Sequence, residues 1–181
     1  MHRNFGGGFD SFYAIKHFKL LPYLADEIKQ RKQSLGEYRA ILIRHTDYQT
    51  DYEAELIKIR ALNDETPLYV FTDNYIVQDF AKTLNFPKLY VNENLQKNDK
   101  KYVPIMHIRW GTPQISIQKI NTEVLSDLFL AALSINIYQT YIVGYMGDRR
   151  FENKEIKSGF VHLATELNRN RVLLDTLLRN R

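Results

Sequence analysis

A change of hydrophobic period along residues 39–93 constrains the fold of this chain more than any other feature. Short apolar runs at 39–45, 67–73 and 88–93 are separated by amphipathic segments at 51–62 and 74–85. Uninterrupted apolar runs indicate strands that are covered on both faces, and their alternation with helices over short connections is typical of βαβ units. We therefore predict an α/β fold, with a Rossmann-like parallel sheet flanked by helices.

The N-terminal part and the middle of the chain carry breaks that limit their elements. Segment 12–36 has apolar residues at helical spacing; Pro22 is expected to split this helix, and Gly36 to end it. Segment 94–116 is polar and contains two prolines, so we predict a long excursion with one short strand at 105–108.

The C-terminal third returns to regular patterns. We expect a helix at 119–136, a fourth buried strand at 138–145 and a polar loop at 147–157. Helices at 158–170 and 171–180 follow, and the leucine-rich face of the last one is either core or a dimer surface.

Length and composition favour one soluble domain. The 181 residues divide into a Gly-rich segment and helix at 1–37 and a Rossmann-like domain at 38–181. The absence of cysteine excludes disulfides and thiolate metal sites, and no leader or membrane span is evident, so we expect a cytoplasmic protein. The net charge of +4 suits an anionic ligand but is too small to indicate nucleic acid.

Polar side chains follow the first two predicted strands at the edge where open α/β sheets bind ligands. Arg44, His45 and Asp47 follow the first strand, and Asp73 and Asn74 follow the second. A guanidinium there can pair two phosphate oxygens at once. The alternatives are a structural Arg44–Asp47 pair that closes the strand end, and a helix cap at Asp73.

Two further positions are candidates. Ser158 and Gly159 begin a predicted helix, where backbone N–H groups favour an anion, although simple capping by Ser158 explains them equally well. Asp127 lies on the apolar face of a helix and needs a partner, which is either a ligand or an ordinary arginine or lysine. The histidine spacing fits no metal site, and neither a nucleophile elbow nor a P-loop is present.

Taken in order, four segments resemble the C-terminal half of the fucosyltransferases that use GDP-fucose, of the α-1,6 and α-1,2 types. They are LIRHTDY (42–48), VFTDN (70–74), VLSDLFLAAL (124–133) and SGFVHLATEL (158–167), within a resemblance that spans 38–168. It implies a fold like the C-terminal domain of a GT-B glycosyltransferase.

The resemblance also implies a nucleotide-sugar site. Arg44 would bind the β-phosphate of GDP, and Ser158 with the amides of Gly159 and Phe160 would bind the same diphosphate. Asp127 would read the guanine. Neither a metal nor a cofactor is expected, because the arginine neutralises the leaving diphosphate.

The same resemblance implies roles around the acceptor. Asp73 would hold the loop after the first strand or contact the acceptor region, and Asp47 belongs with Arg44 to the catalytic group. Asp51 or Glu53 would take the proton of a glycan acceptor, with inversion at the sugar carbon. His45 is expected to bind the nucleotide sugar from the position of the family's second arginine.

Departures from the family pattern leave other interpretations open. Leu42 stands in place of a histidine and Tyr48 in place of a lysine, and about 38 residues precede the first motif, where the family has a whole N-terminal domain. The partner is then either that missing domain or a second copy of the chain. The alternatives are a non-catalytic nucleotide-sugar-binding or interaction module, and a glycosyltransferase that uses a different nucleotide sugar.

Overall fold

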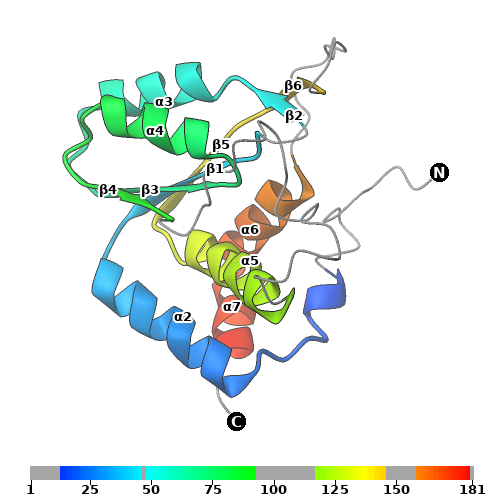
Figure 1. Cartoon of the computed structure of the whole chain (residues 1–181). Helices are drawn as coiled ribbons and strands as arrows, with labels where there is room; N and C mark the ends of the chain where they lie inside the picture. Colours follow the sequence, from blue (N-terminus) through cyan, green and yellow to red (C-terminus); the bar gives the residue numbers. More distant parts are fainter. Residues whose placement is uncertain (1–12, 46–47, 93–116, 146–157, 180–181) are drawn as a thin grey trace.

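A four-stranded parallel sheet forms the centre of the computed structural model, which describes residues 13–45, 48–92, 117–145 and 158–179 (Figure 1). Its strands are β1 (Arg39–Ile43), β3 (Leu68–Thr72), β4 (Leu89–Val91) and β5 (Asn136–Gln139). They lie in the order β4-β3-β1-β5, with every neighbouring pair parallel. The predicted α/β fold with a helix-flanked parallel sheet is confirmed, and the third-second-first-fourth order is that of a doubly wound sheet.

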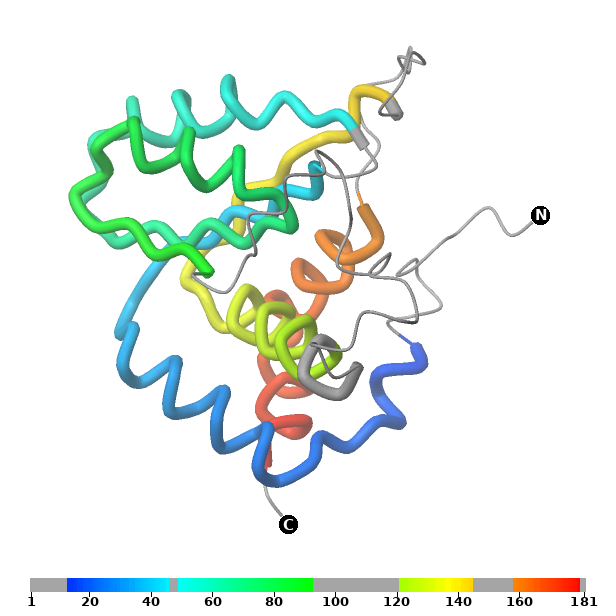
Figure 2. The backbone as a smooth tube through the Cα atoms, in the orientation of Figure 1, coloured from blue at the N-terminus to red at the C-terminus, as the bar shows by residue number. Residues whose placement is uncertain are grey.

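Helices cover both faces of this sheet (Figures 1 and 2). One face carries α3 (Tyr52–Ala61) and α4 (Tyr75–Thr83). The other carries α5 (Ile117–Ala132), α6 (Gly159–Arg169) and α7 (Arg171–Leu178), with α2 (Pro22–Leu35) packed beside them. No helix in the described ranges is long and apolar enough to cross a membrane.

Strand β1 explains why its sequence is apolar without alternation. Ala40 and Leu42 point into the core beneath α5 and α6, whereas Ile41 and Ile43 point into the core beneath α3 and α4. Both faces are therefore buried, as the uninterrupted run predicts.

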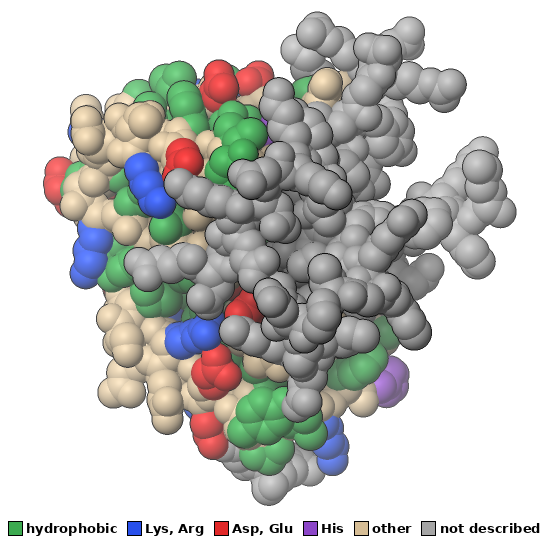
Figure 3. Space-filling model, in the orientation of Figure 1, with side chains coloured by type: hydrophobic (Ala, Val, Ile, Leu, Met, Phe, Trp, Pro, Cys, Tyr) green, Lys and Arg blue, Asp and Glu red, His purple; other side chains and the backbone are tan. Residues whose placement is uncertain are grey.

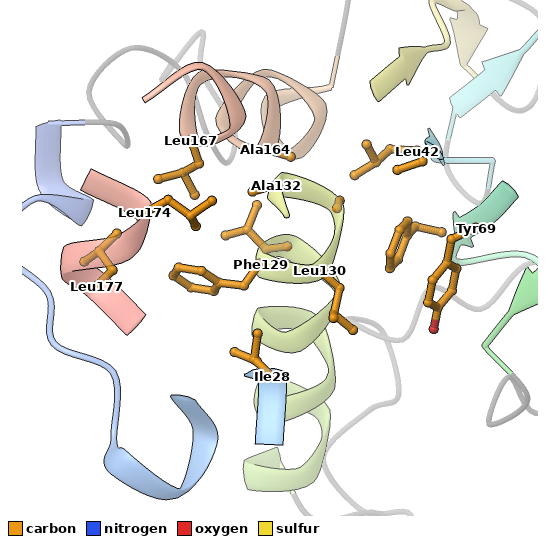
Figure 4. Close-up of a cluster of buried hydrophobic side chains, with 14 of the residues drawn as sticks. Ile28, Leu42, Tyr69, Phe129, Leu130, Ala132, Ala164, Leu167, Leu174 and Leu177 are labelled. Atoms are coloured by element: carbon orange, nitrogen blue, oxygen red, sulfur yellow. The ribbon is translucent and has the colours of Figure 1, made fainter. Parts of the chain in front are cut away.

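The larger core is built around α5 (Figure 4). Phe129 and Leu130 lie among Ile28 of α2, Leu167 of α6 and Leu174 of α7. Each such side chain contributes about 2 kcal/mol when it is removed from water. The leucine face of α7 thus belongs to the core of the same chain.

The N-terminal breaks act as predicted. Pro22 occupies the first turn of α2, where its missing N–H is not needed. Gly36 ends the helix with φ +70°, a left-handed conformation that favours glycine. The short strand predicted at 105–108 lies outside the described residues.

The prediction of one strand at 138–145 is wrong. β5 ends at Gln139, and β6 (Ile142–Tyr145) pairs antiparallel with β2 (Tyr48–Thr50), a strand that was not predicted. The break falls at Thr140, whose hydroxyl donates to the carbonyl of Leu42 at 2.9 Å. The pairing of β5 with β1 ends one residue earlier, at Gln139, and the chain then leaves the parallel sheet.

Candidate functional site

The boundary between β1 and β5 is where the direction of winding reverses. The crossover from β1 to β3 runs through α3 on one face of the sheet, and the crossover from β4 to β5 runs through α5 on the other (Figure 1). Ligands of open α/β sheets bind outside the carboxyl ends of the strands at such a point. Here Arg44 and His45 follow β1, Thr140 follows β5, and the β2–β6 pair stands beside them.

The loop between β3 and α4 holds the backbone of His45 at both of its polar groups. The His45 N–H donates to Asp73 Oδ1 at 2.9 Å, and Asn74 Nδ2 donates to the His45 carbonyl at 2.6 Å. Asn74 also caps α4, because its Oδ1 accepts from the Ile76 N–H at 2.9 Å. The helix cap is therefore Asn74 and not Asp73, whose carboxylate binds the neighbouring loop. We call the two contacts to the His45 backbone, from Asp73 and from Asn74, the His45 clamp.

The ring of His45 is held by the end of β2. Its Nδ1 lies 3.1 Å from Thr50 Oγ1 and accepts from the Thr50 N–H at 3.3 Å. Because a backbone N–H can only donate, this contact requires an unprotonated Nδ1 and places the ring hydrogen on Nε2. The His45 and Tyr52 rings pack in a T-shaped arrangement, with their centroids 4.7 Å apart. Burial lowers the pKa of His45, and the carboxylate of Glu53 opposes part of that shift.

The remaining residues predicted after β1 differ in what the structure says of them. Arg44 is half-buried, directly before the clamped His45. Asp51 is exposed immediately before α3, and Glu53 is exposed in the first turn of that helix. Asp47 lies outside the described residues. The structure thus places Arg44, His45, Asp73 and Glu53 in one neighbourhood.

Ser158 is the N-cap of α6, as the sequence predicts. Its hydroxyl oxygen accepts from the Val161 N–H at 3.3 Å, and the residue is buried. Gly159 and Phe160 form the half-buried first turn. The Ser158 hydroxyl therefore already has an internal partner, and the first-turn N–H groups of Gly159 and Phe160 are the ones left to meet an anion.

Asp127 lies on the β3–β4 side of the sheet and not at the β1–β5 boundary. Burial raises the pKa of its carboxyl group to about 7, and Arg31 of α2 and a hydrogen bond with Asn92 oppose that shift. Asn92 follows the last residue of β4. None of these contacts links Asp127 to Arg44.

Three residues of this neighbourhood were not singled out from the sequence: Thr50, Tyr52 and Thr140. Thr140 gave a signal that was missed, because it is a hydroxyl residue within an apolar run. Thr50 and Tyr52 gave none, since their roles depend on where the turn after β1 brings the chain.

Charge is dispersed over the face of the molecule that Figure 3 shows. Figure 3 shows basic and acidic side chains interspersed on the face in view, without a basic patch among its coloured residues. Within the described ranges, no group of three or more histidine, aspartate or glutamate residues is placed to hold a metal ion.

Comparisons with protein-family models, with curated proteins and with solved structures gave no match to this chain. The fucosyltransferase resemblance therefore rests on its four sequence motifs.

Proposed function

We propose that this chain is a glycosyltransferase-like domain of the GT-B type. It would bind GDP-fucose outside the carboxyl ends of β1 and β5 and transfer fucose to a glycan acceptor, with inversion and without a metal. The observation that carries the proposal is the position of Arg44, at the end of the strand that borders the reversal of winding.

The His45 clamp supports this role for Arg44. A residue whose neighbour is fixed at both its N–H and its carbonyl has a defined backbone position before any ligand arrives. Preorganised charge of this kind stabilises a developing negative charge without reorganising first. Arg44 is half-buried, so part of its side chain remains in reach of a ligand from solvent.

The proposed reaction is a direct displacement at the sugar carbon. The acceptor oxygen forms a bond to C1 of fucose as the bond between C1 and the β-phosphate oxygen breaks, and the electron pair leaves with GDP. The Arg44 guanidinium stabilises the negative charge that grows on the diphosphate. The acceptor proton goes to Asp51 or Glu53, both of which are exposed beside the start of α3.

A second candidate, a non-catalytic binding or interaction module, is favoured by other contacts. The Ser158 hydroxyl binds its own helix, and Asp127 contacts Asn92. Two groups expected to face the donor thus already have partners within the chain. A domain that kept the fold but lost turnover would look like this.

Thermal melting with nucleotides tests the binding step. GDP at about 100 times its dissociation constant should raise the melting temperature by about 5–10 °C, and Arg44→Met should remove the shift. Arg169→Met is the matched control, because Arg169 is an exposed arginine on α6 paired with Glu166. A shift with UDP alone would exclude GDP-fucose as donor, and no shift with GDP, UDP or ADP would favour the interaction module.

Turnover is tested separately by release of GDP from GDP-fucose with glycan acceptors. Asp51→Asn and Glu53→Gln should each fold normally, since both side chains are exposed, and the variant of the true base should lose most of the activity. Binding of GDP without release in any arm would leave the domain as a nucleotide-sugar-binding module that needs a partner, either another domain or a second copy.

A further inference from the structure

We propose that His45 is a pH-sensitive latch, whose neutral ring holds the end of β2 beside the end of β1 and whose protonated ring releases it. The inference uses the described contacts of His45 and does not depend on the donor or on turnover.

The latch is anchored on one side. Both polar groups of the His45 backbone are bound by Asp73 and Asn74, so the ring projects from a fixed point. Asn74 is in turn tied to α4 through its cap. Protonation of the ring therefore cannot be relieved by a simple shift of the His45 backbone.

The other side of the latch depends on the protonation state. Thr50 is only 6% exposed, and its N–H donates to Nδ1. In the imidazolium both ring nitrogens are donors, so an N–H on Nδ1 would face the Thr50 N–H across 3.3 Å. The threonine hydroxyl, 3.1 Å away, can turn to accept, but the backbone N–H then has no acceptor on the ring.

The surroundings of the ring set the direction in which the pKa of His45 is shifted. Glu53 of α3 favours the charged ring, Tyr52 presents an uncharged aromatic ring, and Asp73 meets the His45 backbone and not the imidazole. Burial outweighs Glu53, so the pKa of His45 lies below 6.5 and the latch is closed at neutral pH.

The element released is a weak one. β2 comprises Tyr48–Thr50, and its register with β6 is irregular between Gln49 and Thr50. A short two-stranded pair has little stability of its own and depends on contacts such as the one to His45. Loss of that contact is expected to loosen the β2–β6 pair while β1, at the centre of the sheet, stays intact.

The direction in which stability changes with pH follows from the lowered pKa of His45. The pKa of His45 is lower in the folded state than in the unfolded state, so the unfolded chain takes up its proton first as pH falls. The stability that the neutral ring provides is present above pH 6.5 and is lost as pH falls through the folded pKa.

The experiment follows the His45 ring and the backbone amide of Thr50 together by NMR during a titration downward from about pH 7.5. The ring should be the Nε2–H tautomer at the start. Corrected hydrogen-exchange protection of the Thr50 amide should fall about tenfold with the same midpoint as the ring, while β1 amides keep theirs. In His45→Asn, an amide oxygen replaces Nδ1 as a non-titrating acceptor, and Thr50 should stay protected throughout.

His17→Asn, at an exposed histidine outside this neighbourhood, should behave as the natural chain. An Nδ1–H tautomer at the start would overturn the proposal without any variant. So would a ring that titrates while Thr50 keeps its protection, an equal loss in His45→Asn, or loss at Thr50 only when β1 unfolds as well.

Discussion

The two ends of β1 carry arginines in opposite settings. At the amino end, Arg39 is 2% exposed and donates to the carbonyls of Asp64 and Thr66, at 2.9 and 2.8 Å from one nitrogen. It also pairs with the Asp64 carboxylate at 3.1 Å. At the carboxyl end, Arg44 is half-buried, and the contacts that fix the loop there bind the backbone of His45.

This difference separates a structural charge from a candidate functional one. At the amino edge the Arg39 guanidinium donates its hydrogen bonds to the carbonyls of a loop, so it is used for structure and not for a ligand. At the carboxyl edge an aspartate and an asparagine fix the loop through the backbone of His45. The alternative of a structural pair between Arg44 and Asp47, a residue outside the described ranges, is decided by the stability of an Arg44 variant.

Replacing each arginine by methionine should give the largest contrast. Arg39→Met is expected to cost about 3 kcal/mol of unfolding free energy, because the half-buried carbonyl groups of Asp64 and Thr66 lose the donors of a buried guanidinium. Arg44→Met should cost less than about 1 kcal/mol. Urea denaturation of both variants measures this, and equal losses would show that Arg44 is a structural residue too.

Asp127 should give the next largest effect, as a dependence on pH. The pKa of its carboxyl group is raised to about 7 in the fold, above its ordinary value of 3.8, so the folded state holds a proton that the unfolded state has lost. The stability from that proton is full below pH 3.8 and is lost as pH rises towards 7.

The expected loss from Asp127 is at most about 1.4 kcal/mol per pH unit, and about 2 kcal/mol between pH 5 and pH 7 for this half-buried group. Asp127→Asn should not lose stability in this way. The difference in unfolding free energy between the natural chain and the variant should therefore narrow or reverse between pH 5 and pH 7, and become constant above about pH 8. The contribution of His45 is common to both and cancels. A difference that does not change with pH would place Asp127 among ordinary surface carboxylates.

Asn74 should separate the clamp from the helix cap. Asn74→Ala removes the cap of α4 and the donor to the His45 carbonyl, and should cost about 2 kcal/mol. Asn74→Ser keeps a capping oxygen and loses the donor to His45, so it should cost about half as much. Urea denaturation measures both. If Asn74→Ser is as stable as the natural chain, the contact with His45 contributes nothing, and identical losses in the two variants would mean that the cap contributes nothing.

The sequence predicts the layers of this fold because β1, β3 and β4 are apolar on both faces and their helices are amphipathic. It does not predict the structural role of Arg39. The partners of this side chain include the carbonyl groups of residues 64 and 66, which the turn before β3 brings near. Any residue type offers a carbonyl, so no sequence pattern marks such a partner. A hydroxyl residue within an apolar run marks Thr140, but no pattern marks its acceptor, the carbonyl of Leu42, so the sequence does not show that the strand breaks there.

Only those parts of the candidate site that follow from the order and direction of the strands are predictable from the sequence. Parallel strands place their carboxyl ends at one edge, which suffices to bring Arg44 and His45 near Asp73. The position of Asp127 depends instead on how α5 is turned about its axis, which the spacing of its apolar residues leaves open. Its neighbours Asn92 and Arg31 come from two other elements.

The smallest expected effect concerns the hydroxyl one residue beyond the pairing of β5 with β1. Thr140→Val keeps the shape of this buried side chain and removes the hydrogen bond to the Leu42 carbonyl, which should cost about 1 kcal/mol. Thr176→Val is the matched control, because its hydroxyl bonds within α7 at an exposed position and its loss should cost almost nothing. If both variants are equally stable, the strand break at Thr140 is set by the pairing of β6 with β2. The carboxyl edge would then owe its form to the β2–β6 pair, which His45 holds at one end.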